Sequence, residues 1–382
     1  MNGTSRLARA RAAVGSMIVV TLGAVVIAGC VPSHTVSRSV TAGRTCPEMT
    51  DQRGLAEISW YRPEHEGDAR QLERWCLTVG APVFVPEPTA GRPEEHLPTE
   101  ENPAPLLIST WNPNAGAGEM LRFLGDELGH ACDDPSTSSD RHFVLLLQEA
   151  LRRGADIPNP PVGDPAIPAT VVESDRPTPR LDVVEVARRC GLSLFYAAAA
   201  RNGPDVRDGL REEKGNAILS TLPLSDPAVV ELPFEGARRI SVVATLTAPG
   251  GATLRVASVH FLSTARPWRI LTTGNASRYR EASGLLDALR TIESEQGEIP
   301  AIAAGDLNTW SQRETALRHL RTYFRDSPPP LEQPTRGGFP TDHILFRGTG
   351  SPAERVVTGS YARVEGTYNS DHHPLIARLR LR

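Results

Sequence analysis

The sequence predicts an α/β fold, and three observations support this prediction. Short apolar runs of strand length recur along the chain, and segments with helical spacing of apolar residues lie between them. Several apolar runs end in Asn, Glu, His or Asp, which is typical of buried strands that deliver polar side chains into a cleft. The chain has 382 residues, of which 40% are hydrophobic, enough for one large domain or two small ones.

Residues 1–30 are typical of an export signal. Three arginines precede an apolar stretch at 14–26, and residues 27–30 resemble the lipobox of bacterial lipoproteins, in which cleavage exposes the cysteine for lipidation. The alternative is an uncleaved membrane helix, because the apolar stretch is nearly long enough to span a bilayer. We expect a lipid anchor on Cys30 that holds the body of the protein outside the cytoplasm, at a bacterial membrane.

Residues 31–103 form a tether and a small N-terminal extension in this interpretation. The segment to about residue 50 is polar, and the segment from 86 to 104 is rich in Pro and Glu. Between them, residues 59–85 show helical spacing followed by a short strand pattern. We expect this extension to be a cap packed on the main domain, without chemistry of its own.

Apart from Cys30, the chain has four cysteines: Cys46, Cys76, Cys132 and Cys190. An even number in an oxidising compartment predicts two disulfides, and three pairings are possible. We expect Cys46–Cys76 in the extension and Cys132–Cys190 in the main domain. The alternative for the second pair is two buried free thiols.

The main domain, residues 104–382, contains all the segments with a clear chemical pattern. A long loop rich in Pro, Asp and Gly is expected at 151–178, and a hairpin turn at 249–251. Helices are expected at 119–128, 181–190, 278–292 and 313–324. Strands are expected at 106–112, 143–149, 193–199, 215–220, 239–246, 253–261, 300–308, 341–346 and 375–381.

Polar residues stand at the ends of many of these strands. Asp306 and Asn308 lie two residues apart, so an extended chain points them to the same side. A carboxylate beside a carboxamide can hold a metal-bound water and take its proton. Each such residue also has an ordinary explanation as a turn residue, a cap or a buried imidazole. Their recurrence favours one site, formed by Asn112, Glu149, His260, Asp306, Asn308, Asp342, Asp371 and His372.

In their order along the chain, these motifs resemble those of the endonuclease/exonuclease/phosphatase superfamily. The resemblance covers about residues 104–382 and implies a four-layer α/β/β/α sandwich of two mixed sheets with outer helices, to which this chain adds its small N-terminal extension. The matching motifs are Trp111-Asn112, Gln148-Glu149, Gly215-Asn216-Ala217-Ile218-Leu219-Ser220, Val259-His260, Gly305-Asp306-Leu307-Asn308, Asp342-His343-Ile344-Leu345 and Ser370-Asp371-His372.

The resemblance also implies a metal-dependent phosphoesterase. Glu149 would be the main metal ligand, supported by Asn112. Asp371 would lie close to the metal and would ligate it directly or through water. Such hard oxygen ligands suit Mg²⁺ or Mn²⁺, which keep several waters and bind substrate phosphate directly.

The remaining roles implied by the resemblance concern catalysis. Asp306 and Asn308 would orient the nucleophilic water or the scissile phosphate. Asp342 would pair with His372, and His260 would lie opposite, so that one imidazole takes a proton and the other gives one. Arg239 matches a phosphate-facing position, although Arg238 could serve instead or both could be solvated.

Substrate class stays open at the level of sequence. His260 resembles the deoxyribonuclease, sphingomyelinase and 5-phosphatase branches and disfavours a base-excision role. The formal net charge of −4 disfavours non-specific DNA binding, and nucleic acids, phospholipid head groups and small phosphate esters compete. Residues 151–178 and 262–275 are expected to line the cleft, with Trp268 as a single candidate for bilayer contact. The alternative function is a catalytically inactive member that binds a ligand or partner; no protein partner is predicted.

Overall fold

The computed structural model describes residues 36–38, 50–63, 79–89, 105–133, 141–158, 180–202, 211–263, 275–351 and 354–381. Residues 33–382 form one compact unit. The leader with Cys30, the cysteines Cys46 and Cys76, most of the expected 151–178 loop and Trp268 lie outside the described residues.

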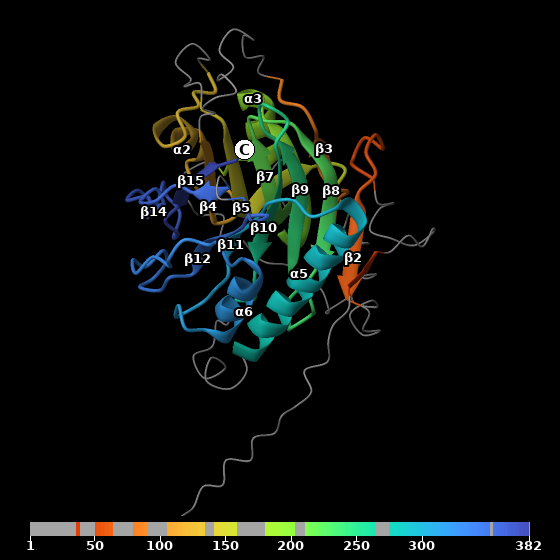
Figure 1. Ribbon diagram of the computed structural model, residues 1–382. Helices are drawn as coiled ribbons and strands as arrows, with labels where there is room; N and C mark the ends of the chain where they lie inside the picture. The colour runs from red at the N-terminus through yellow and green to blue at the C-terminus, as the bar shows by residue number, and fades with distance from the viewer. Residues whose placement is uncertain are drawn as a thin grey trace, which may run out of the picture. The chain divides into compact units, whose positions relative to one another are not determined.

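Among the described residues, seven strands form the first sheet (Figure 1). β2 pairs in parallel with β8, β10 pairs in parallel with β11, and the other neighbours are antiparallel. In spatial order the strands are β1 (Val36–Arg38), β2 (Ser59–Pro63), β8 (Leu224–Glu231), β9 (Ile240–Thr247), β10 (Thr253–His260), β11 (Ala301–Asp306) and β12 (Asp342–Arg347).

The second sheet is also mixed, because β4 and β5 are parallel and the other described pairs are antiparallel. Its main path in spatial order is β13 (Arg355–Val356), β15 (Leu375–Arg380), β4 (Leu106–Trp111), β5 (Phe143–Gly154), β7 (Arg211–Ser220), β6 (Ser193–Asn202) and β3 (Val83–Val85), and β14 (Ala362–Arg363) pairs with β15.

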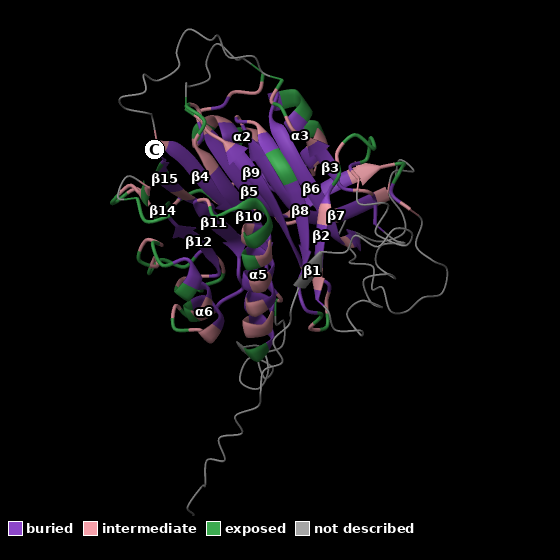
Figure 2. Cartoon of the chain, turned by 45° about the vertical axis from the view of Figure 1, so that its right-hand side comes forward, coloured by how far each residue is buried: buried purple, intermediate pink, exposed green. Residues whose placement is uncertain are grey.

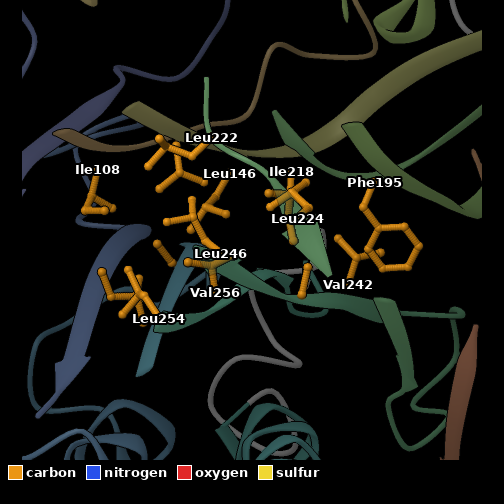
Figure 3. Close-up of a cluster of buried hydrophobic side chains, with 14 of the residues drawn as sticks. Ile108, Leu146, Phe195, Ile218, Leu222, Leu224, Val242, Leu246, Leu254 and Val256 are labelled. Atoms are coloured by element: carbon orange, nitrogen blue, oxygen red, sulfur yellow. The ribbon is translucent and has the colours of Figure 1, made fainter. Parts of the chain in front are cut away.

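Alternating apolar residues hold the two sheets face to face. On β4, Ile108 enters the core between the sheets, whereas Leu107 on the other face packs toward the outer helices. Figure 3 shows side chains from both sheets meeting in this layer, among them Leu146 and Val256. Fully burying a side chain of this size contributes roughly 1.5–3 kcal/mol, so this layer is a major source of the stability of the domain.

Helices cover both outer faces and complete four layers. α5 (Asn275–Gln296) and α6 (Thr315–Tyr323) pack on the first sheet through a second apolar cluster, and α5 crosses this face in Figure 2. α2 (Met120–Asp126) and α3 (Val183–Cys190) pack on the second sheet through a third cluster. The predicted four-layer α/β sandwich is therefore confirmed. In the part of the chain that the structure describes, no helix is both long enough and apolar enough to cross a membrane.

Two expectations about secondary structure were wrong. The strand β8 was missed, because Asp226-Pro227 reads as a turn; a bulge between Ser225 and Ala228 accommodates the dipeptide within the strand. The loop expected from residue 151 begins later, because β5 continues to Gly154. The hairpin of β9 and β10 is confirmed.

The N-terminal extension contributes strands to both sheets. β2 adds to β8 at one sheet, and β3 adds to β6 at the other. The predicted disulfide Cys132–Cys190 is confirmed and ties the end of α3 to the segment after α2.

Candidate active site

The period-two pattern of the strands places the polar residues at one end of the layer between the sheets. On β11, Ile302 and Ala304 lie in the inter-sheet core, so Asp306 continues the same face. On β10, Leu254 and Val256 also lie in this core, so His260 lies on the same face of its strand. The corresponding positions on the neighbouring strands are Asn112 after β4 and Asp342 at the start of β12.

Glu149 reaches the site through an irregularity in β5. The register with β7 shifts between Leu147 and Ala150, so that Gln148 and Glu149 together stand opposite one residue of the partner strand. Glu149 has φ 48°, a left-handed conformation that is uncommon for a residue other than glycine. Backbone strain of this kind concentrates at functional sites.

Asp306 is the centre of the site. It is fully buried, and its Oδ2 lies 3.3 Å from Asn112 Nδ2, 3.5 Å from His260 Nε2 and 3.6 Å from His372 Nε2. The structure thus brings Asn112 within hydrogen-bond distance of Asp306. Burial raises the pKa of Asp306 above its ordinary range, although the positive charge of His372 opposes this effect.

His372 and Asp342 form the expected pair. His372 Nδ1 lies 2.9 Å from Asp342 Oδ2, which also accepts a hydrogen bond from Thr341 Oγ1 at 2.8 Å. Burial by itself lowers the pKa of His372, but the charges of Asp342 and Asp306 outweigh burial and raise it to about 9. His372 is therefore an imidazolium at neutral pH, and its Nε2 lies 3.6 Å from Asp306 Oδ2.

His260 has the opposite electrostatic environment. Burial and the positive charges of Arg239 and Lys214 hold its pKa well below its ordinary value, so the ring is neutral. Arg239 Nη1 lies 3.4 Å from His260 Nδ1, and since a guanidinium only donates, Nδ1 is the acceptor and the proton is on Nε2. Arg238 instead forms a buried ion pair with Glu231, so Arg239 is the arginine at the site.

Asn308 shapes the loop that follows β11. Its backbone has φ 50°, its N–H donates to Asp306 Oδ1 at 2.9 Å, and its Nδ2 donates to Phe261 O at 2.9 Å. Asn308 therefore ties the end of β10 to the end of β11. This keeps His260 beside Asp306.

Two of the expected metal ligands carry basic partners. Lys214 Nζ lies 2.8 Å from Glu149 Oε2, and Arg336 Nη2 lies 2.7 Å from Asp371 Oδ2. Burial favours the neutral form of Glu149, but the charges of Lys214 and other cations outweigh burial and lower its pKa. Asp371 is 41% exposed and lies outside the buried cluster around Asp306.

Lys214 and Arg336 were missed from the sequence, although one signal pointed to the lysine. Lys214 is the only lysine of the chain and directly precedes the Gly215-Asn216 motif. Arg336 offered no such signal, because it lies in an irregular segment before β12.

The buried groups fit a divalent cation. Asp306, Asp342 and His372 form one buried group whose polar atoms lie within 4.8 Å of one another, and because His372 is charged, the two carboxylates are its available metal ligands. Asp342 Oδ1 and His372 Nε2 are buried without a hydrogen-bond partner within the described residues. Carboxylate oxygens with unused capacity are suitable ligands for a hard cation, with Glu149 as a further carboxylate at the same end of the sandwich.

A family model and several solved structures are similar to this chain. The model of the Endonuclease/Exonuclease/phosphatase family matches residues 106–372, and a search of curated proteins finds no match. Similar solved structures include an endonuclease/exonuclease/phosphatase from Beutenbergia cavernae, with 18% identity over 73% of this chain and 72% of that chain and a TM-score of 0.45. The human Nocturnin catalytic domain with bound sulfate anion has 17% identity over 73% of this chain and 95% of that chain, with a TM-score of 0.44. An endonuclease/exonuclease/phosphatase family protein from Leptotrichia buccalis has 13% identity over 72% of this chain and 100% of that chain, with a TM-score of 0.47.

The family model spans more than half of the chain, and its matched range contains the whole cluster around Asp306. The chain therefore belongs to the endonuclease/exonuclease/phosphatase family, whose members are metal-dependent phosphoesterases and nucleases.

Proposed function

We propose that this protein is a Mg²⁺-dependent phosphoesterase, with Mn²⁺ as an alternative ion, that hydrolyses phosphate esters outside the cytoplasm. The observation that carries the proposal is the position of Asp306 Oδ2 between His260 and His372, with Asp342 behind His372. A carboxylate with a raised pKa beside a charged imidazole supplies a proton acceptor and a proton donor to one reacting centre.

The protonation states suggest a catalytic role for each of these residues. Asp306 accepts a proton from the attacking water, and His372 donates one to the leaving oxygen from Nε2. His260 keeps its proton on Nε2 and orients Asp306, while Arg239 beside it offers guanidinium donors to a phosphate oxygen. The expectation from the sequence was that one imidazole takes a proton from water and the other gives one to the leaving oxygen; we propose Asp306 in place of His260 as the acceptor. A bound Mg²⁺ supplies neutralisation of charge on the phosphoryl oxygens.

The site is tested with the full-length protein in detergent and Mg²⁺. Bis-p-nitrophenyl phosphate, p-nitrophenyl phosphate, plasmid DNA and sphingomyelin are offered in parallel, with EDTA in a matched set. Asp306→Asn keeps the shape of the side chain and is expected to lose about 10²–10⁴-fold in rate. Asp133→Asn removes a carboxylate that is 69% exposed and paired with Arg189, and is expected to keep full activity.

The four substrates decide between the candidate classes. Cleavage that survives thorough chelation, or that survives in Asp306→Asn, contradicts the proposed site. A folded protein that neither binds Mg²⁺ nor cleaves any substrate supports the inactive ligand-binding alternative. Nucleic acid, phospholipid head groups and small esters are each represented, so a positive result also names the substrate class.

The location outside the cytoplasm is part of the proposal. Its support is the lipobox at residues 27–30 and the disulfide Cys132–Cys190, since such bonds persist in oxidising compartments. We expect the protein in the membrane fraction of cells grown with labelled fatty acid, and the label on Cys30. A Cys30→Ser variant that stays membrane-bound through its uncleaved leader and carries the same label contradicts lipidation at that residue.

A further inference from the structure

Lys214 lies at the same end of the inter-sheet layer as the catalytic residues. On β7, Ile218 enters the inter-sheet core, and the alternation places Asn216 and then Lys214 on the same face. Asn216 Nδ2 donates to Ser258 O of the opposite sheet at 3.0 Å. Lys214 lies two residues from Asn216 on β7, and His260 lies two residues from Ser258 on β10. Both side chains therefore lie next to the Asn216–Ser258 contact between the sheets.

The ammonium of Lys214 is paired with Glu149. Lys214 Nζ lies 2.8 Å from Glu149 Oε2, and the two side chains are 14% and 21% exposed. Glu149 is the carboxylate that the sequence predicts as the main metal ligand. A divalent cation on this oxygen and an ammonium at hydrogen-bond distance from it repel each other, so the two cations compete for Glu149.

The residue type suits such an exchange. The chain has 41 basic residues, and only this one is a lysine. An arginine fork holds a carboxylate through two parallel hydrogen bonds, whereas a lysine is a point charge on a flexible stem that can reorient. The ammonium of Lys214 is also close enough to His260 for its charge to lower the pKa of that imidazole.

We propose that Lys214 is a phosphate-binding residue of the active site that neutralises Glu149 until a divalent cation takes over this carboxylate. When the cation binds, the ammonium leaves Glu149 and contacts a phosphate oxygen of the substrate. The inference deepens the proposed function and rests on it for the identity of the substrate group. It assigns to Lys214 both an effect on metal affinity and an effect on phosphate affinity.

Both effects are measured by binding, without turnover. Mn²⁺ binding to the full-length protein in detergent is followed by calorimetry, and inorganic phosphate is then added to the Mn²⁺-loaded protein. Lys214→Met keeps the apolar stem and removes the charge. We expect it to bind Mn²⁺ about tenfold more tightly and inorganic phosphate about tenfold more weakly than the wild type.

Two variants separate charge from packing. Lys214→Arg keeps the positive charge, and we expect its Mn²⁺ affinity to stay within about threefold of the wild type. Arg290→Met removes a positive charge from the exposed surface of α5, where Arg290 pairs with Asp287, and should leave both affinities unchanged. If Lys214→Met does not fold, Lys214→Gln takes its place.

The inference is overturned if Lys214→Met binds Mn²⁺ no more tightly than the wild type, if its phosphate affinity is unchanged, or if Lys214→Arg tightens Mn²⁺ binding as much as Lys214→Met does. Failure of the proposed function has a different signature. In that case the wild type cleaves no phosphate ester, while the binding differences between the Lys214 variants persist.

Discussion

Replacing Asp342 by Asn tests the electrostatics of the site most directly. Asp342 is buried, and its Oδ2 lies 2.9 Å from His372 Nδ1. The amide oxygen of Asn can still accept this hydrogen bond and the one from Thr341, so the variant removes the charge and keeps the shape.

The size of the effect follows from the pKa of His372. This pKa is raised from 6.5 to about 9, with Asp342 as the leading favourable charge and Asp306 as the second. One pKa unit corresponds to about 1.36 kcal/mol, so the net preference for the imidazolium is about 3 kcal/mol. Without the charge of Asp342, mainly the charge of Asp306 opposes the effect of burial, and we expect the pKa of His372 to fall by about 2 pH units.

The stability of the metal-free protein should change with pH in a defined direction. A histidine whose pKa is raised in the folded state contributes stability that is fully present below its unfolded pKa of about 6.5 and is lost as pH rises through about 9. Denaturation in EDTA should therefore show the pH-dependent difference between wild type and Asp342→Asn at its largest near pH 6, about 2–3 kcal/mol, and smallest above pH 9.

A histidine-selective NMR titration and rate measurements complete the assay. At pH 7.5 the wild-type His372 is charged and the variant ring is largely neutral, so we expect kcat/KM to fall by about 10²–10⁴-fold. The reasoning is refuted if His372 titrates at the same pH in both proteins. It is also refuted if the activity of the variant stays within about threefold of the wild type.

Three further predictions concern the fold around the site. A Cβ at Gly305 would lie 1.8 Å from the backbone oxygen of Val259, so we expect Gly305→Ala to push β10 and β11 apart and cost about 2–4 kcal/mol; an unchanged unfolding midpoint in urea contradicts this. Burial raises the pKa of Glu281 to about 8, so the folded state resists ionisation of this group and loses stability as pH rises from about 4.5 to 8. In this window the free energy of unfolding of Glu281→Gln should rise relative to that of the wild type by about 1.4 kcal/mol per pH unit. Stability curves of the two proteins that run parallel over this pH range contradict the prediction. Replacing Cys132 and Cys190 by Ala opens a cross-link between residues 58 apart and should cost about 4 kcal/mol by loop-closure entropy; a melting temperature that is the same with and without the disulfide argues against it.

The sequence alone determined the strands that carry the site. Asp306 and His260 end mostly apolar runs of strand length, and in a strand every second residue lies on the same face. The sequence also shows the glycine at position 305, but it does not show why a glycine is needed there. It is required because the backbone of β10 passes too close for a side chain.

Only the tertiary structure decided which groups meet. The bulge that turns Glu149 toward Lys214 depends on the register of β5 against β7, and register is a property of two strands that no single segment encodes. The choice between Arg238 and Arg239 likewise depended on Glu231, which lies on the strand β8 that the sequence did not reveal. The ionisation states of the two histidines also depend on the tertiary structure. His260 and His372 have the same intrinsic pKa, but burial and the charges that other elements place around each ring make His260 neutral and His372 charged.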